Sequence, residues 1–217
     1  MSNLLNSKLL EDVIKEYYSL REEDYIFFLS KSRKKKITTE SFVIRFSPSN
    51  FKHLIGCQKL DDKVFTKHSV ELTETLYNDF KSGNLNNNTD FSSILSSLKF
   101  DEIKSRLELI KDFKSLIISP ETNIYQHNSN STQSIPTTIV YDYLIHIKDT
   151  NCPDNCYLFC RQNRASYILE PVSIFKTNKK YHIGHLLWNI DGFYTSKKHY
   201  EKTHENLYPK YPEGYTN

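Results

Sequence analysis

The sequence predicts an α+β fold, with N-terminal helices packed on a C-terminal antiparallel β-meander. Two observations support it. Apolar side chains recur at helical spacing in residues 4–20, 69–81 and 100–118. After Pro120 the chain changes to short β-rich segments separated by polar loops. Because helices and strands do not alternate along the chain, a parallel doubly wound sheet is excluded.

The first helix is predicted by an apolar stripe at Leu5, Leu9, Val13, Tyr17 and Leu20. Residues 25–29 and 41–46 then form the strands of an early hairpin, and the basic run 31–36 lies near its turn. In the second strand the side chains alternate, as expected for a sheet with one buried face.

Capping signals mark the next helices. Ser47 or Asn50 can cap a short helix that has Pro48 in its first turn, and Gly56 can end it. A second helix starts at Ser69, and the long helix over 100–118 stops before Pro120.

Five segments are expected to build the meander, and loops such as 127–136 separate them: 122–126, 137–147, 156–162, 165–175 and 180–187. The domain organisation follows as an N-terminal helix and basic hairpin (1–40), an α+β core (41–190) and a polar, Tyr-rich C-terminal arm (191–217).

The composition is that of a globular protein. Hydrophobic residues make up 38% and charged residues 25% of the 217 residues, which excludes a disordered chain. A net charge of +3 is too small for a nucleic-acid coat protein, although the runs 31–36 and 176–180 could make one face basic. No apolar stretch is long enough to span a membrane, and four cysteines do not make a disulfide scaffold. A cytoplasmic location without a membrane partner is therefore expected.

The cysteines Cys152, Cys156 and Cys160 are spaced by four. On a strand this spacing places Cys156 and Cys160 on one face but roughly 13 Å apart, too far for one metal ion. Cys152 could approach Cys156 across a turn, with His127 or His146 completing a site, but zinc is the less favoured interpretation. Phosphate-binding glycine motifs and the paired carboxylates of metal nucleases are also absent, so neither a metal nor a cofactor is predicted.

The remaining chemistry is RNA cleavage without a metal. It needs a base for the 2′-hydroxyl, an acid for the leaving oxygen and cations for the phosphate charge. Eight residues could supply these groups, and composition does not choose among them: His53, Lys104, Arg106, Tyr141, Asp142, Arg161, Arg164 and Ser173.

Four segments in order resemble a known family. They are FSPSNFKHLIG (46–56), KSRLELI (104–110), YDYLI (141–145) and LEPVSIF (169–175). Together they resemble the fourth of the phage nuclease families with the Barnase–EndoU–colicin–RelE fold, over about Phe42 to Tyr181. Two positions depart from the family pattern. Ile174 stands where an aromatic residue is expected, and Tyr141 stands where a small residue is usual.

The resemblance implies a Barnase/RelE-like endoribonuclease whose catalytic positions fall on His53, Arg106, Asp142 and Ser173. In this interpretation His53 is the base and Arg106 clamps the phosphate. Ser173 donates to a phosphate oxygen, and Asp142 orients the histidine or pairs with Arg106.

RNA, either tRNA or mRNA, is the expected substrate. Five residues are expected to bind it, with the tyrosines stacking on bases: Lys104, Tyr141, Tyr143, Arg161 and Arg164.

A toxin or a phage or mobile-element protein of this kind could also bind a cognate antitoxin or a host protein. Two alternatives stay open. One is a non-catalytic accessory protein that binds nucleic acid or protein, and the other is an inhibitory protein that docks through residues 191–217.

Overall fold

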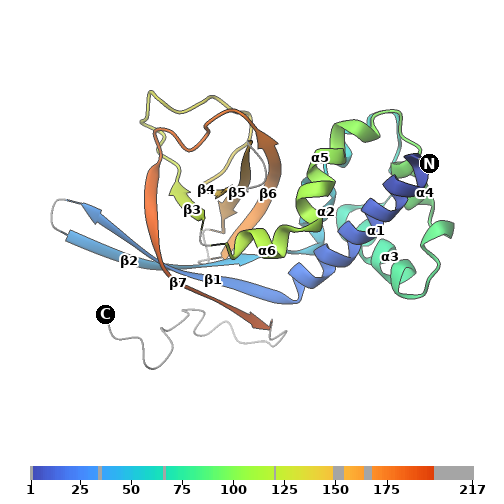
Figure 1. Cartoon of the computed structure of the whole chain (residues 1–217), viewed down its shortest axis with the longest axis horizontal. Coiled ribbons are helices and arrows are strands. Elements are labelled where there is room, and N and C mark those ends of the chain that lie inside the picture. The colour runs from blue at the N-terminus through green and yellow to red at the C-terminus, as the bar shows by residue number, and fades with distance from the viewer. Residues whose placement is uncertain are drawn as a thin grey trace.

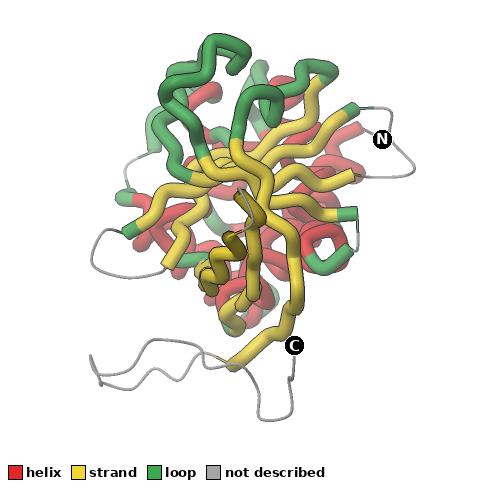
Figure 2. Tube along the Cα trace, turned by 90° about the vertical axis from the view of Figure 1, so that its left-hand side faces the viewer, coloured by secondary structure: helices red, strands yellow, loops and turns green. Residues whose placement is uncertain are grey.

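The computed structural model describes residues 2–33, 36–65, 67–119, 121–148, 154–163 and 168–197. The helices gather at one end of the molecule and the strands at the other (Figure 1). In the turned view the strands lie in front of the helices (Figure 2). This arrangement confirms the predicted α+β class with its N-terminal helices.

The helices follow the predicted order. They are α1 (Ser2–Arg21), α2 (Pro48–Leu54), α3 (Ser69–Lys81), α4 (Thr89–Leu95), α5 (Phe100–Lys111) and α6 (Phe113–Ile117), with short 3-10 turns η1 (Cys57–Lys59) and η2 (Leu85–Asn87). The single helix predicted over 100–118 is wrong, because the chain breaks at Asp112 between α5 and α6. After the break the N–H of Lys114 donates to a carboxylate oxygen of Glu16 in α1, at 2.9 Å.

The strands form one sheet. They are β1 (Glu23–Arg33), β2 (Lys36–Arg45), β3 (Thr122–Gln126), β4 (Tyr143–Lys148), β5 (Asn155–Gln162), β6 (Ile168–Thr177) and β7 (Leu186–Lys197). In the part of the chain that the structure describes, these strands close into a barrel in the order β1-β2-β6-β5-β4-β3-β7.

The simple meander is therefore only partly correct. Strands β3 to β6 are consecutive antiparallel neighbours, as predicted. The early hairpin β1–β2 is inserted into the same sheet, where β2 runs parallel to β6. Strand β7 crosses over to pair with β3 and β1. The hairpin assigned to residues 1–40 thus shares one sheet with the strands of the later core.

The last strand also differs from the expectation. Residues 180–187 were expected to be a strand, but they turn at Gly184 (φ 84°), and β7 begins only at Leu186. It continues to Lys197, so residues 191–197 of the expected arm belong to a strand. The rest of that arm, 198–217, lies outside the described residues.

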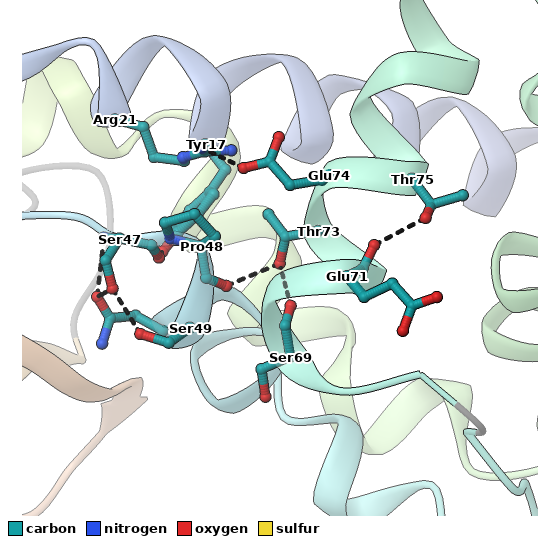
Figure 3. Close-up of polar contacts among 11 residues, drawn as sticks. Tyr17, Arg21, Ser47, Pro48, Ser49, Ser69, Glu71, Thr73, Glu74 and Thr75 are labelled. Carbon is teal, nitrogen blue, oxygen red and sulfur yellow. Dashed lines mark hydrogen bonds and ion pairs between the residues drawn. The ribbon is translucent and has the colours of Figure 1, made fainter. Parts of the chain in front are cut away.

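A main hydrophobic core joins the barrel to the helices. Tyr17 of α1 packs against Phe46 and Phe51 and donates its hydroxyl to the carbonyl oxygen of Ser47 at 2.6 Å (Figure 3). A second, smaller core covers the outer face of the sheet, and we call this face the outer aromatic face. Its buried members are Tyr141, Leu144, Tyr157, Phe159 and Tyr181. None of the described helices has the length and apolar character needed to cross a lipid bilayer.

Candidate functional site

Arg106 lies between helix α5 and strand β6. Its neighbours on α5, Ile103 and Leu107, are fully buried and fix this side of the helix against the core. The side chain of Arg106 is only 8% exposed, and its Cζ atom lies 5.7 Å from the centre of the Phe175 ring. The guanidinium is thus held at the edge of the outer aromatic face.

None of the described residues compensates the charge of Arg106. Among the described residues, no carboxylate forms an ion pair with it, and its buried Nη1 atom has no hydrogen-bond partner. Burial alone lowers the pKa of this guanidinium. A buried cation without a partner is costly, and guanidinium groups match phosphate oxygens in pairs. This site is therefore suited to bind an anion.

Helix α2 is fixed at its start by a set of polar contacts. The amide oxygen of Asn50 accepts from the backbone N–H and the hydroxyl of Ser47, at 2.9 and 2.8 Å. From α3, Thr73 donates its hydroxyl to the carbonyl oxygen of Pro48 at 2.8 Å (Figure 3). Phe51 of α2 is buried in the main core, so the position of the helix is well determined.

His53 lies on the outer side of α2. Its neighbour Leu54 is buried, whereas the imidazole of His53 is exposed and forms no hydrogen bond with any described residue. The carbonyl oxygen of His53 accepts from the N–H of Gly56 at 3.1 Å. The side chain of Arg106 packs on Gly56, three residues after His53. The predicted phosphate clamp therefore lies against the turn that follows the predicted base.

Gly56 makes this close approach possible. It has φ +85°, and a Cβ atom added to it would lie 3.1 Å from Cδ of Arg106 and 3.2 Å from Cγ2 of Ile103. The glycine of the FKHLIG segment thus serves both a left-handed turn and the fit of Arg106.

We expect Gly56→Ala to lower the free energy of unfolding by more than the cost of a left-handed alanine, which is about 1–2 kcal/mol. The matched control is Gly83→Ala. Gly83 has φ +72°, but its added Cβ would meet nothing within 4 Å, so only the backbone cost applies. Denaturant unfolding of both variants tests this prediction, and equal losses would show that the contact with Arg106 is unimportant.

Of the other two predicted catalytic residues, Ser173 lies on the sheet face that Arg106 borders, whereas Asp142 does not interact with Arg106. Ser173 of β6 pairs with Phe159 and therefore shares the sheet face of Phe175, over which Arg106 lies. Asp142 precedes β4, where its Oδ2 atom accepts from the N–H of Gln162 at 2.8 Å. Among the described residues it forms no ion pair or hydrogen bond with Arg106 or His53, so both roles expected for it, orienting the histidine and pairing with Arg106, stay predictions.

The predicted substrate-binding residues are scattered. Tyr143 is 2% exposed and packs against Phe42 inside the barrel, so it has no free ring face for a base. Lys104 is two residues from Arg106, which places it on nearly the opposite side of α5. Arg161 is exposed next to Phe159 on β5, and Arg164 lies outside the described residues.

Four histidines gather on the outer aromatic face, and they come from three separate segments: His127, His146, His182 and His185. The loop from β3 to β4 and the loop from β6 to β7 lie side by side at the top of the barrel (Figure 1). The side chain of Asn128 in the first donates to the carbonyl oxygen of Gly184 in the second at 3.3 Å. Tyr141, which was expected to bind substrate, lies in this group, 4.8 Å from the ring of His127.

The first histidine–tyrosine pair is His185 with Tyr141. The Nε2 atom of His185 lies 2.6 Å from the hydroxyl of Tyr141, and its Nδ1 atom accepts from the N–H of Asn128 at 3.4 Å. The neutral ring must therefore carry its proton on Nε2. Burial, followed by the neighbouring His127 and His182, lowers the pKa of His185, and burial raises the pKa of Tyr141 to about 12.

The second pair is His182 with Tyr157. The Tyr157 hydroxyl lies 2.7 Å from Nδ1 of His182. Below this pair, the ring of His146 stacks on His182 at 4.5 Å and 10° and on Tyr157 at 4.9 Å and 24°. The amide oxygen of Asn155 holds Nε2 of His146 at 2.9 Å. These rings form a stack with a fixed orientation.

The comparisons with known proteins identify the family. The model of the family described as phage-Barnase-EndoU-ColicinE5/D-RelE like nuclease 4 matches residues 9–208. The chain belongs to this phage nuclease family. The resemblance seen in the sequence is thereby confirmed, and the match extends beyond the range 42–181 on which it rested. Comparisons with curated proteins and with solved structures found no match.

The histidine group of this nuclease was not predicted as a site. His127 and His146 were considered only as additional zinc ligands, and His182 and His185 were assigned to a strand. The usable signal was Gly184 between the last two, because a lone glycine favours a turn that gathers its neighbours.

The described cysteines of the nuclease are buried. Cys156 and Cys160 lie on the same face of β5 and are buried in the main core, as their spacing predicted, while Cys152 lies outside the described residues. Among the residues that the structure describes, no group of three or more His, Cys, Asp or Glu side chains is placed to hold a metal ion. The absence of zinc stays a prediction, to be checked by metal analysis of the purified protein.

The lowered pKa of His185 has a consequence for stability. Above its ordinary pKa of 6.5, the ring is neutral in both the folded and the unfolded chain. As the pH falls below 6.5, the unfolded chain binds the proton first, so the folded state loses stability until its own lower pKa is passed. We expect the fall in unfolding free energy below this pH to be smaller in His185→Gln than in the wild type. The exposed His68, replaced in the same way, is the control.

Proposed function

We propose that this phage-type nuclease is an endoribonuclease that cleaves RNA without a metal ion, with Arg106 binding the phosphate of the cleaved bond. The observation that carries the proposal is the buried guanidinium of Arg106 beside the outer aromatic face, which forms no ion pair with any described residue. Proteins rarely bury an uncompensated charge, and the family's chemistry offers a reason for this one: a phosphodiester supplies the missing anion.

The reaction needs few groups. The 2′-hydroxyl oxygen attacks phosphorus, and the bond from phosphorus to the 5′-oxygen breaks. A 2′,3′-cyclic phosphate and a free 5′-hydroxyl result. A base takes the proton of the 2′-hydroxyl, and an acid returns a proton to the leaving oxygen. Arg106 would stabilise the charge that grows on the phosphate oxygens.

His53 is our candidate for the base. It lies within one turn of Gly56, on which Arg106 packs, and its exposed imidazole can reach a bound substrate. Ser173, on the face that Arg106 borders, would donate to a phosphate oxygen. Asp142 would hold the end of β5 at Gln162 instead of the base, given its hydrogen bond there.

The substrate class follows from the chemistry. Attack by a 2′-hydroxyl restricts cleavage to RNA, and tRNA and mRNA are the candidates. A role as a toxin or a phage or mobile-element effector in the cytoplasm would fit, with a cognate antitoxin or a host protein as a partner.

One observation favours a second candidate function, that of a non-catalytic RNA-binding accessory protein. The imidazole of His53 has no described partner that would orient it as a base. An anion site at Arg106 without a working base would bind RNA and leave it intact.

The test is incubation of the wild-type protein with a mixed pool of tRNA and mRNA in EDTA, followed by analysis of the fragment ends. The proposal expects fragments that carry 2′,3′-cyclic phosphates and 5′-hydroxyls. Cleavage that requires a divalent ion would refute the mechanism, and tight binding without any cleavage would establish the accessory protein.

A further inference from the structure

The histidines and tyrosines of the outer aromatic face form a surface that the cleavage chemistry at Arg106 does not use. His182, His185 and Tyr125 are half-buried, so one part of each ring is covered and another is open to solvent. The rings beneath them, His146 and Tyr157, are buried. Planar groups are thus presented to solvent on a rigid support.

Two rings of this surface, His185 and Tyr141, are uncharged at neutral pH. The pKa of His185 is lowered and that of Tyr141 raised, so both groups stay neutral at pH 7. Hydrogen bonds inside each pair hold the rings in place, at 2.6 Å for His185 with Tyr141 and 2.7 Å for His182 with Tyr157. Neutral flat rings with fixed donors and acceptors match the shape and chemistry of nucleobases.

Buried aromatic rings connect this surface to the anion site. Arg106 lies over Phe175, and Phe175 stacks on Phe159 with ring centres 5.2 Å apart. Phe159 in turn contacts the Tyr141 ring edge-on at 4.9 Å, and Tyr141 bonds to His185. Arg106 and the histidines therefore lie at the same sheet face, linked through the buried rings of Phe159 and Tyr141.

We propose that His182, His185 and Tyr125 form a nucleobase-binding surface, which holds the unpaired bases of single-stranded RNA next to the bond cleaved at Arg106. The choice of RNA rests on the proposed function, whereas the preference for exposed bases rests on the rings themselves. Because His182 and His185 are each held by a tyrosine hydroxyl before RNA binds, these two side chains lose little freedom on binding. The surface would also make cleavage sensitive to the bases beside the cut.

The experiment measures equilibrium binding of a short 2′-O-methyl oligonucleotide, which cannot be cleaved, by fluorescence anisotropy in EDTA. Wild-type protein is compared with His182→Leu, which removes the flat ring, and His182→Phe, which keeps one. The loss of one stacked base typically lowers affinity by roughly 5- to 150-fold. We expect a loss in that range for His182→Leu and a clearly smaller loss for His182→Phe. The control is His68→Leu, an exposed histidine at the start of α3, which should bind like the wild type.

Two further probes identify what is recognised. An oligonucleotide with abasic positions and a fully paired duplex should both bind the wild type more weakly than the single strand. If His182→Leu binds all probes like the wild type, or if the duplex binds as well as the single strand, the surface does not hold bases. A thermal melt of each variant shows whether any loss comes from unfolding.

The outcome separates this inference from the proposed function. If the wild-type protein cleaves RNA in EDTA and His182→Leu binds the oligonucleotide normally, the proposed function stands and the base-binding surface is rejected. If the wild-type protein binds the oligonucleotide in a base-dependent way but never cleaves RNA, the base-binding surface stands and the ribonuclease activity is rejected.

Discussion

Replacing Arg106 with methionine is expected to lower the rate of RNA cleavage by about 10²–10³-fold, the usual cost of removing one donor to a developing phosphate or oxyanion charge. The same change should leave the free energy of unfolding at or above the wild-type value. Arg106 is 8% exposed without an ion pair among the described residues, and methionine keeps the apolar contact with Gly56 while removing a buried charge.

Activity and stability must be measured on the same preparations. Arg106→Lys keeps a charge but loses the paired donors, so its activity should lie between those of the wild type and Arg106→Met. Lys104→Met is the matched control, because it removes a cation from nearly the opposite side of α5. A large loss of stability with a proportional loss of activity in Arg106→Met would instead make Arg106 a structural residue.

Replacing His53 with alanine is expected to lower cleavage by about 10²–10⁴-fold with an unchanged thermal melt, as is typical when a positioned acid–base group is lost. The melt should not change because the imidazole is exposed and has no hydrogen bond with a described residue. His68→Ala removes another exposed imidazole from the helical end of the molecule and should keep full activity.

Full activity in His53→Ala would exclude it as the base. The next candidate would then be His185, whose ring stays neutral at pH 7 but would have to give up the hydrogen bond from the N–H of Asn128 at Nδ1 before it could accept a proton. The pH dependence of cleavage by His185→Gln would decide between a base and a binding residue, since only loss of a base removes the acidic limb of the profile.

Local patterns predicted the helices and most strands but not how the sheet closes. The alternation in residues 41–46 indicated a strand with one buried side. Phe42 and Ile44 are buried as expected, but Val43 on the other side is also buried, against Ile26 and Phe28. The pattern does not say which strand lies next to it, so the parallel pairing of β2 with β6 could not be predicted. Such pairings depend on contacts between residues far apart in the sequence.

The course of β7 shows how a strand can resemble a loop. Asp191 and Gly192 are typical turn residues, yet both lie within the strand. A bulge pairs Leu29 with Ile190 and Phe28 with Gly192, and Asp191 between them accepts a hydrogen bond from Ser30 at 2.9 Å. A hydrogen bond between residues so far apart in the sequence cannot be predicted from the residues around either partner.

The site was predictable where short segments carry it. The FKHLIG segment indicated both His53 and the glycine on which Arg106 packs. The histidine group was missed because periodicity treats each histidine as one polar residue of its own segment. Only the folded loops bring His182 over β4 and β5, where it stacks on His146.

The central claim is that the 2′-hydroxyl of RNA attacks the phosphate that Arg106 holds. The most direct test uses an RNA oligonucleotide that the wild-type protein cleaves in EDTA, and a copy with a single 2′-deoxy sugar on the 5′ side of the cleaved bond. The account predicts that cleavage at this bond disappears in the copy, while the copy binds as tightly as the RNA. Continued cleavage at the deoxy position would contradict the account, because water and not the 2′-hydroxyl would then be the nucleophile.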